Sequence, residues 1–322
     1  MAGGAERILR RRIKSVQSTK KITKAMELIA ASRILKAQQR VNAARPYSEQ
    51  ITEVIRNLAA AGAGKGSALL EQREEIRTVA FVVVAGDRGL CGGYNTNVIR
   101  AVEREMAQQR AQGKQTRLIT VGKKATAYFR FRGYELDDSF VGFSDEPTYE
   151  DARSVAEGVV RRFEEGEYDA VELAYTQFVS AGVQRVLLKR FVPIETDILE
   201  AAEQSDGPSA DYEFEPGPGD ILERLLPRYA EARLYAALLE GAASFFAAQQ
   251  RAMKSATDNA EELITKLSRV MNRARQDAIT TEIMEIVGGA EALRQGQSGG
   301  TDLIADSSLR VQDALADALN RN

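Results

Sequence analysis

Histidine and tryptophan are absent from this sequence of 322 residues, and Cys91 is its only cysteine. The lack of histidine excludes imidazole acid–base chemistry, Ser-His-Asp and Cys-His nucleophilic sites, and Cys/His zinc sites. One thiol cannot form an internal disulfide, which favours a reducing compartment. No apolar run approaches the ~20 residues that span a bilayer, and no apolar signal core follows the Arg-rich start. We therefore expect no direct membrane insertion.

Net charge is also nearly absent, because 44 Lys and Arg residues stand against 46 Asp and Glu residues. The charges are nevertheless segregated, with twelve basic and two acidic residues in 6–45, and ten acidic and no basic residues in 195–223. The basic block is compatible with binding to nucleic acid, to a membrane surface or to acidic protein surfaces. No aromatic residue precedes Tyr47 to stack on bases, and the apolar face is thin. The pattern favours acidic protein partners and no nucleic acid.

Long helices are predicted at both ends of the chain. Residues 5–58 contain no glycine and are rich in helix formers, and Pro46 is expected to kink or locally break this helix. Helix formers return from 220 to 288, where Gly288-Gly289 is predicted to end the second helix. The second helix would exceed the first by about 16 residues, or ~24 Å. Its coiled-coil seam is predicted at four apolar positions, namely Leu263, Leu267, Val270 and Ala274.

Between the helices the pattern changes to alternating strands and helices. Residues 77–85 form a β-branched run that is typical of a buried parallel strand. Thr148 and Asp151 have the spacing of an acidic helix cap, and the turn at 180–182 predicts a hairpin. This pattern indicates an α/β domain with a largely parallel sheet. The expected order is strand 77–85, helix 95–112, strand 117–121, helices 123–132 and 148–166, and strands 170–179 and 185–193.

The predicted fold class is α/β, with two long terminal helices that form an antiparallel coiled coil and a central Rossmann-like α/β domain. An overhanging, weakly charged helix is unstable alone, so we expect it to lie inside a partner. We divide the chain into six parts: an N-terminal coiled-coil helix (1–58), a linker (59–76), the α/β domain (77–202), an acidic loop (203–219), a C-terminal coiled-coil helix (220–290) and a C-terminal extension (291–322).

The Gly-rich turn at 86–93 lies between a strand and a helix, where dinucleotide enzymes hold a pyrophosphate. It lacks the G-x-G-x-x-G spacing, so we interpret it as a structural turn. The acid pairs Asp137-Asp138 and Glu164-Glu165 are interpreted as solvated surface, and Cys91 as a small buried hydrophobe. We predict no catalytic residue, no cofactor site and no metal site.

Three separated words of this sequence resemble one family, the γ subunit of bacterial F-type ATP synthase. The first word covers 20–33 (KKITKAMELIAASR) and the second covers 87–95 (DRGLCGGYN). The third covers 251–260 (RAMKSATDNA), followed by 272–276 (NRARQ) and 285–290 (EIVGGA). They occur in order over about residues 1–293. The resemblance implies a non-catalytic central rotor shaft of a proton-translocating ATP synthase, which couples rotation of the membrane ring to the catalytic sites of the head.

The resemblance also implies partners and contact residues. The partners would be the alpha and beta subunits of the catalytic head, the epsilon subunit and the membrane c-ring, with a peripheral location on the cytoplasmic face of the bacterial cell membrane. The matching head contacts are Lys24, Met26, Arg251, Arg275 and Gln276. A Tyr-x-Tyr-Glu-Pro word of the family is similar to residues 212–216 here, with Phe for the second Tyr, so the matching ring contacts are Tyr212, Phe214 and Glu215.

Residues 294–322 extend beyond the resemblance, with a Gly/Ser-rich start and a short amphipathic segment after it. We interpret this extension as an ordered or docking tail that modulates rotation, against the alternative of a disordered end. Two other functions remain open from the residues alone. One is an α/β nucleotide-binding enzyme with helical oligomerisation arms, and the other is a basic-helix nucleic-acid binder.

Overall fold

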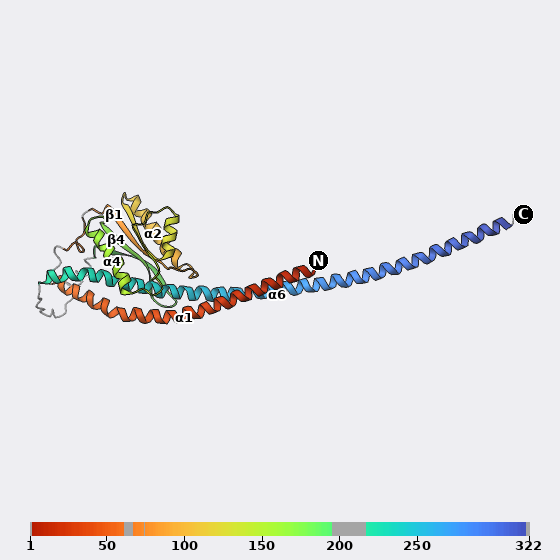
Figure 1. Ribbon diagram of the computed structural model, residues 1–322, viewed down its shortest axis with the longest axis horizontal. Helices are drawn as coiled ribbons and strands as arrows, with labels where there is room; N and C mark the ends of the chain where they lie inside the picture. Colours follow the sequence, from red (N-terminus) through yellow and green to blue (C-terminus); the bar gives the residue numbers. More distant parts are fainter. Residues whose placement is uncertain (1, 61–66, 74, 195–216, 320–322) are drawn as a thin grey trace. The chain divides into compact units, whose positions relative to one another are not determined.

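The computed structural model describes residues 2–60, 67–73, 75–194 and 217–319, with only the backbone described for 2, 3, 5, 59, 60 and 295–319. The chain forms two compact units. Unit 1 combines Met1–Lys21 with Asp258–Asn322, and unit 2 is Ile22–Thr257. The long helices α1 (Ala2–Ala60) and α6 (Pro218–Leu319) each contribute to both units (Figure 1). The α/β domain belongs to unit 2.

Helix α6 is longer than its sequence pattern predicts. It has 102 residues and continues through Gly288-Gly289, so the prediction that these glycines end the helix is wrong, and the predicted overhang is too short. Neither glycine has the positive φ of a helix C-cap. A helical glycine costs only about 1 kcal/mol relative to alanine, which does not by itself stop a helix. Helix α1 likewise runs unbroken through Pro46, so the predicted local break is wrong.

Helices α1 and α6 run antiparallel, as predicted. Lys20 lies opposite Glu261 in unit 1, and Thr23 lies opposite Thr257 in unit 2. Along α1 one line of covered side chains recurs at steps of three and four residues, which is the heptad spacing of a coiled coil. They are Glu6, Leu9, Ile13, Val16, Lys20, Thr23, Glu27, Ala30, Ile34, Ala37, Val41, Ala44, Ser48, Ile51, Ile55 and Leu58.

The covered face of α6 differs from the predicted seam. Leu263 is 37% exposed and Val270 is 53% exposed, so these two members of the predicted seam are wrong, whereas Leu267 is buried. The covered positions are Met253, Thr257, Ala260, Ile264, Leu267, Met271, Ala274 and Ala278. Six of those eight residues are Met, Ala or Thr in place of a large branched side chain. For this reason an apolar count alone selects Leu263 and Val270 wrongly.

The domain contains a five-stranded sheet in the order β3-β2-β1-β4-β5. Strands β1 (Thr78–Val84), β2 (Gln115–Val121), β3 (Asp138–Phe140) and β4 (Ala170–Phe178) pair in parallel. Strand β5 (Gln184–Val192) pairs antiparallel with β4, which confirms the predicted hairpin. The helices are α2 (Tyr94–Ala111), α3 (Lys123–Phe131) and α4 (Tyr149–Glu164).

Both faces of the sheet are covered. One face packs with α2 and α3 around Phe81, Met106 and Phe129, which are all buried. The other face packs with α4 and with unit 2 segments of α1 and α6, which bring Ile55 and Leu226 into the same core as Phe163. Helix α4 begins at the predicted cap, where Thr148 and Asp151 form a reciprocal capping box. The paired helices are therefore part of the core of the domain.

Strand β3 was missed by the sequence pattern, which treats Asp137-Asp138 as solvated surface. That interpretation is wrong, because both residues are half-buried. The Tyr168 hydroxyl donates a hydrogen bond of 2.7 Å to Asp137 Oδ2, and Arg117 lies 3.4 Å from Oδ1. Burial and the Asp137 carboxylate together raise the pKa of Tyr168. Glu164 and Glu165 are exposed, as predicted.

Candidate functional site

The three distinctive sequence words meet in the fold. In unit 2 the first and third words face each other across the helix pair, where the hydroxyls of Thr23 and Thr257 lie 2.8 Å apart. In unit 1 Lys20 Nζ lies 3.0 Å from Glu261 Oε1. Thr257 also donates to the Met253 carbonyl, which ties its hydroxyl to its own helix. The buried hydroxyl pair joins the two helices at this register.

The second word forms the turn between β1 and α2. The Asn95 side chain spans it, accepting from the Gly86 amide at 2.8 Å and donating to the Arg88 carbonyl at 3.0 Å. Tyr94 is buried, donates its hydroxyl to the Gly241 carbonyl of α6 at 2.9 Å, and meets the Phe245 ring edge-on. The turn is thereby fastened to α6. Burial raises the pKa of the Cys91 thiol, and Cys91 is buried as predicted.

Asp87 organises the loops at the carboxyl edge of the sheet. Its carboxylate accepts hydrogen bonds from the amides of Lys123, Gly142 and Ser144 and from the Ser144 hydroxyl, at 2.8–3.1 Å. Burial alone would raise the pKa of Asp87, but these donors outweigh it and hold the pKa below its ordinary value. Its acceptor capacity is used by the chain itself.

A loop at residues 144–147, here called the 144–147 loop, lies against α1. Asp145 Oδ2 is 3.9 Å from the Arg33 guanidinium, Glu146 Oε1 is 3.6 Å from Lys36 Nζ, and Arg40 donates to the Pro147 carbonyl. Arg88 of the second word also reaches Asp145, at 3.1 Å. Burial raises the pKa of Asp145 against the lowering effect of both guanidiniums. Sequence reasoning missed this loop, so part of the basic block is engaged within the chain.

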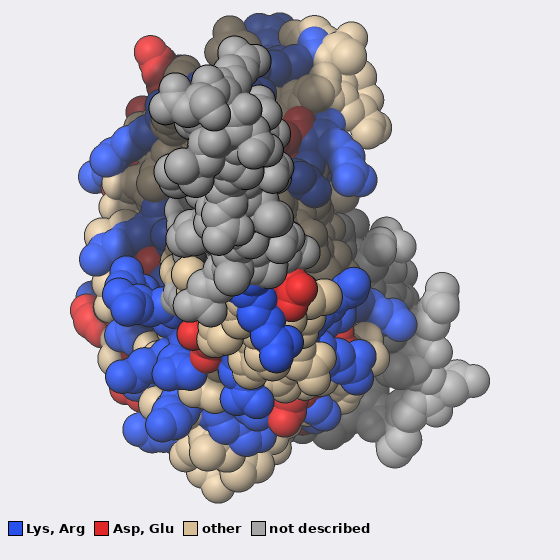
Figure 2. Space-filling model, turned by 90° about the vertical axis from the view of Figure 1, so that its right-hand side faces the viewer, with Lys and Arg blue, Asp and Glu red and all other residues tan. Residues whose placement is uncertain are grey.

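The outer face of α1 carries both charge and exposed apolar side chains. Five large apolar side chains on α1 are more than half exposed, namely Ile8, Ile22, Leu28, Ile29 and Leu35. Basic side chains outnumber acidic ones on the face of the molecule in Figure 2. Exposed apolar groups interleaved with Lys and Arg are typical of an interaction surface that is steered by charge.

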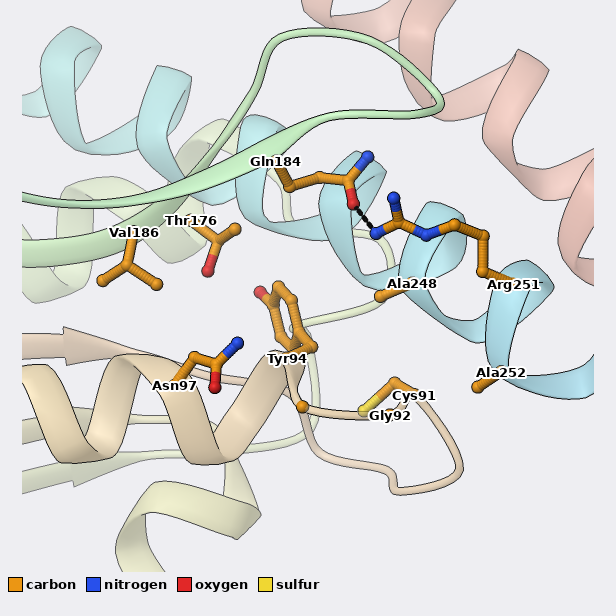
Figure 3. Close-up of a pocket in the computed structure, with 11 residues that line it drawn as sticks. Cys91, Gly92, Tyr94, Asn97, Thr176, Gln184, Val186, Ala248, Arg251 and Ala252 are labelled. Carbon is orange, nitrogen blue, oxygen red and sulfur yellow. Dashed lines mark hydrogen bonds between the residues drawn. The ribbon is translucent and has the colours of Figure 1, made fainter. Parts of the chain in front are cut away.

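The sequence-predicted head contacts occupy different settings. Lys24 is exposed and pairs with Glu27 at 3.1 Å, while Met26 is half-buried. Arg251 is exposed, and its guanidinium donates to the Gly182 carbonyl and to Gln184 Oε1 of the β4–β5 hairpin (Figure 3).

Two further predicted head contacts lie on α6 in unit 1. Arg275 and Gln276 are exposed there. The predicted ring contacts Tyr212, Phe214 and Glu215 lie outside the described residues.

Among the side chains that the structure describes, no three of His, Cys, Asp or Glu gather in an arrangement that would hold a metal ion. No helix among those residues is long and apolar enough to cross a membrane.

Comparison with known proteins identifies the family. The model of a family described as ATP synthase matches residues 6–293. The chain is 51% identical over 299 residues to the ATP synthase gamma chain of Parafrankia sp. (strain EAN1pec), covering 91% of this chain and 99% of the relative. The chain belongs to the ATP synthase gamma chain family. A gamma chain is a non-catalytic subunit of the enzyme and part of its central stalk.

Other relatives agree with this assignment. The ATP synthase gamma chain of Mycolicibacterium vanbaalenii is 48% identical over 301 residues, with 89% of this chain and 97% of the relative covered. A chain in the structure of the Euglena gracilis mitochondrial ATP synthase has the same fold, with a TM-score of 0.66, 20% identity, and coverage of 92% of this chain and 96% of that one. Residues 294–322 lie outside the range matched by the family model.

Proposed function

We propose that this gamma chain acts as a rotating shaft whose helices turn inside a ring of catalytic subunits. The observation that carries this proposal is the exposed stretch of α6 at residues 279–294. Every described side chain from 279 to 294 is exposed, including Ile279, Ile283 and Ile286, although the helix continues to Leu319. A single helix with exposed apolar side chains gains its stability from packing. A ring of protein subunits around the helix would provide that packing.

The proposed mechanism is a population shift. Each catalytic subunit has several conformations, and the side of the shaft that faces it stabilises one of them. Shaft asymmetry is required for this, and α1 supplies it, because one side of α1 is covered by α6 while the other presents Ile22, Ile29 and basic residues. Turning the shaft moves the preferred conformation to the next subunit.

The contact residues follow from the family resemblance. We propose that Lys24, Met26, Arg251, Arg275 and Gln276 meet the alpha and beta subunits of the head. For Arg251 this contact would compete with its bonds to Gly182 and Gln184.

We place Tyr212, Phe214 and Glu215 at the membrane c-ring, with the epsilon subunit beside them, on the cytoplasmic face of the bacterial cell membrane. The coupling ion would be the proton. We also propose that the six parts predicted from the sequence are the functional divisions of the chain.

Co-purification tests the assembly. A tagged full-length chain expressed in its native cell is expected to come out with a large ATPase complex, whose hydrolysis is measured directly. Ile283→Asp should reduce recovery of that complex severalfold, since it places a charge on the apolar side of the bare helix. Glu282→Gln, at the neighbouring exposed position, is the matched control and should leave recovery unchanged. Isolation of the wild-type chain alone would refute the proposal.

A further inference from the structure

Asp145 joins two of the three sequence words, although it belongs to neither of them. Its carboxylate oxygen Oδ2 lies 3.1 Å from Arg88 Nε in the second word, and 3.9 Å from a guanidinium nitrogen of Arg33 at the end of the first word. The Asp145 side chain is only 15% exposed. One half-buried carboxylate is therefore shared by arginines from two separate words.

The residue before Asp145 is also held by the second word. The Asp87 amide donates to the Ser144 hydroxyl at 2.7 Å, and the Ser144 amide and hydroxyl donate to the Asp87 carboxylate at 3.1 and 2.8 Å. Two successive residues of the second word, Asp87 and Arg88, thus hold two successive residues of the 144–147 loop. The turn at 86–93 and this loop are fastened together, and Asp145 is the point at which they meet Arg33 of α1.

Arg33 continues the connection to α6. Its guanidinium lies over the Phe246 ring, 5.5 Å from the ring centroid. Phe246 meets Phe245 edge-on, and Phe245 meets Tyr94 edge-on, with centroid distances of 5.4 and 5.6 Å. Because Tyr94 belongs to the second word, these contacts form a closed circuit from the turn through Asp145, α1 and α6 back to the turn. Packed side chains and ion pairs of this kind carry energetic coupling between segments.

Stability does not account for a charge at this position. Burial raises the pKa of Asp145, and its Oδ1 atom is buried with no hydrogen-bond partner among the described residues. An unsatisfied buried oxygen is unfavourable for the folded state. The side chains of Arg33 and Arg88 are 40% and 65% exposed, so water would solvate both guanidiniums if the carboxylate were removed. Loss of the Asp145 charge is therefore expected to change stability little.

We propose that Asp145 is a positioning residue of the rotor, which holds the turn of the second word against α1 so that the two move together during rotation. This inference rests on the shaft function proposed above. The other contacts of the 144–147 loop with α1, made by Glu146 with Lys36 and by Pro147 with Arg40, do not include the second word. Asp145 contacts α1 and the second word at once.

The functional test measures protons pumped per ATP hydrolysed by the purified complex in lipid vesicles, with the full-length chain in place. Asp145→Asn should lower this ratio about twofold, because the turn and α1 no longer move together. Arg33→Gln should lower it similarly, and the double variant should be no worse than either single variant, since all three remove the same contact. Asp145→Glu keeps the carboxylate and should retain most of the wild-type ratio.

Glu103→Gln is the matched control. Glu103 is a half-buried carboxylate of α2 that pairs with Arg132 at 3.8 Å, within the domain and away from the circuit. Its replacement should leave the pumping ratio unchanged. A fall in this control equal to that of Asp145→Asn would overturn the inference, because any lost carboxylate would then have the same effect.

Hydrogen exchange tests the contact in the isolated full-length chain, independently of the shaft function. The Asp87 amide, which donates to the Ser144 hydroxyl, should exchange about threefold faster in Asp145→Asn, as expected when a partly exposed ion pair is lost. The melting temperature should fall by no more than about 2–4 °C. An unchanged exchange rate at Asp87 would show that Asp145 does not hold the turn and would overturn the inference.

The two proposals fail in different ways. An unchanged pumping ratio in both Asp145→Asn and Arg33→Gln would overturn the positioning role and leave the shaft proposal standing. Recovery of the wild-type chain without an ATPase complex would instead refute the shaft proposal, and with it the role of Asp145 in rotation. The exchange rate of the Asp87 amide would still decide whether Asp145 holds the turn.

Discussion

Helix α6 is covered along its first part and exposed at residues 279–294, although both stretches carry large apolar side chains. Leu238, Phe245 and Ala247 are at most 2% exposed, whereas Ile283 and Ile286 are 55% and 67% exposed. Helix propensity is adequate in both. The difference lies in what surrounds them, because the first part packs on the sheet and on α1, and no described segment covers residues 279–294. Exposed apolar residues on a continuous helix thus indicate a partner outside the chain.

Small residues explain how the sheet approaches the first part so closely. A Cβ added to Gly241 would lie 3.3 Å from the Tyr94 hydroxyl and 3.4 Å from Val84, while one added to Gly288 would meet nothing within 4 Å. Gly241 therefore serves packing, and Gly288 serves no contact within the described chain. Replacing a glycine by a larger residue therefore has a different energetic cost at residue 241 than at residue 288.

Truncating an apolar side chain should give the largest difference in stability change between the two parts of α6. Leu238→Ala should destabilise the isolated full-length chain by about 2–5 kcal/mol, because it leaves a cavity in the core. Ile283→Ala, at an exposed position, should change stability by no more than about 0.5 kcal/mol. Thermal unfolding followed by circular dichroism measures both. Equal shifts would contradict the contrast between the two parts.

Enlarging a glycine gives the next largest effect. Gly241→Leu should cost about 1–3 kcal/mol, because the side chain would overpack against Tyr94 and Val84. Gly288→Leu should instead slow amide hydrogen exchange around residue 288, because it removes a helix cost of about 1 kcal/mol. If Gly241→Leu melted at the wild-type temperature, the close approach of α6 to β1 would be wrong.

Deleting residues 294–322 should have the smallest effect on the isolated chain. The melting temperature of unit 2 should stay within the error of the measurement, since the described side chains before this segment are already uncovered. In the assembled enzyme we expect a changed ATPase rate, in line with the interpretation of a docking tail. An unchanged ATPase rate together with unchanged coupling to proton transport would contradict a regulatory role.

Most of the fold could be predicted because its patterns are local. The apolar run before Gly86, the Thr148–Asp151 cap and the turn at 180–182 each determine an element by short-range chemistry. Strand β3 has only three half-buried residues and pairs through its backbone, so no periodicity marks it. The covered face of α6 depends on what lies opposite it on α1, such as Thr23 opposite Thr257, which a single-helix pattern does not contain.

The motifs of the candidate site could be predicted from the sequence, but their positions in the fold could not. The sequence predicted the structural turn at 86–93, and it did not predict that Tyr94 is fastened to Gly241. The contact of the 144–147 loop with Arg33 joins residues over a hundred positions apart. The hydroxyl of Thr176 is buried without a partner among the described residues because of how other segments pack around β4. Such features arise only when long-range packing is known.

The 144–147 loop and the β4–β5 hairpin attach the domain to two different helices. The loop holds α1 at Arg33, Lys36 and Arg40, while the hairpin holds α6 at Arg251. Twisting the helix pair about its own axis within unit 2 would pull at least one attachment away from the sheet. The domain is thus a lateral brace that raises the torsional stiffness of the pair, and a torque applied to the domain is shared between both helices.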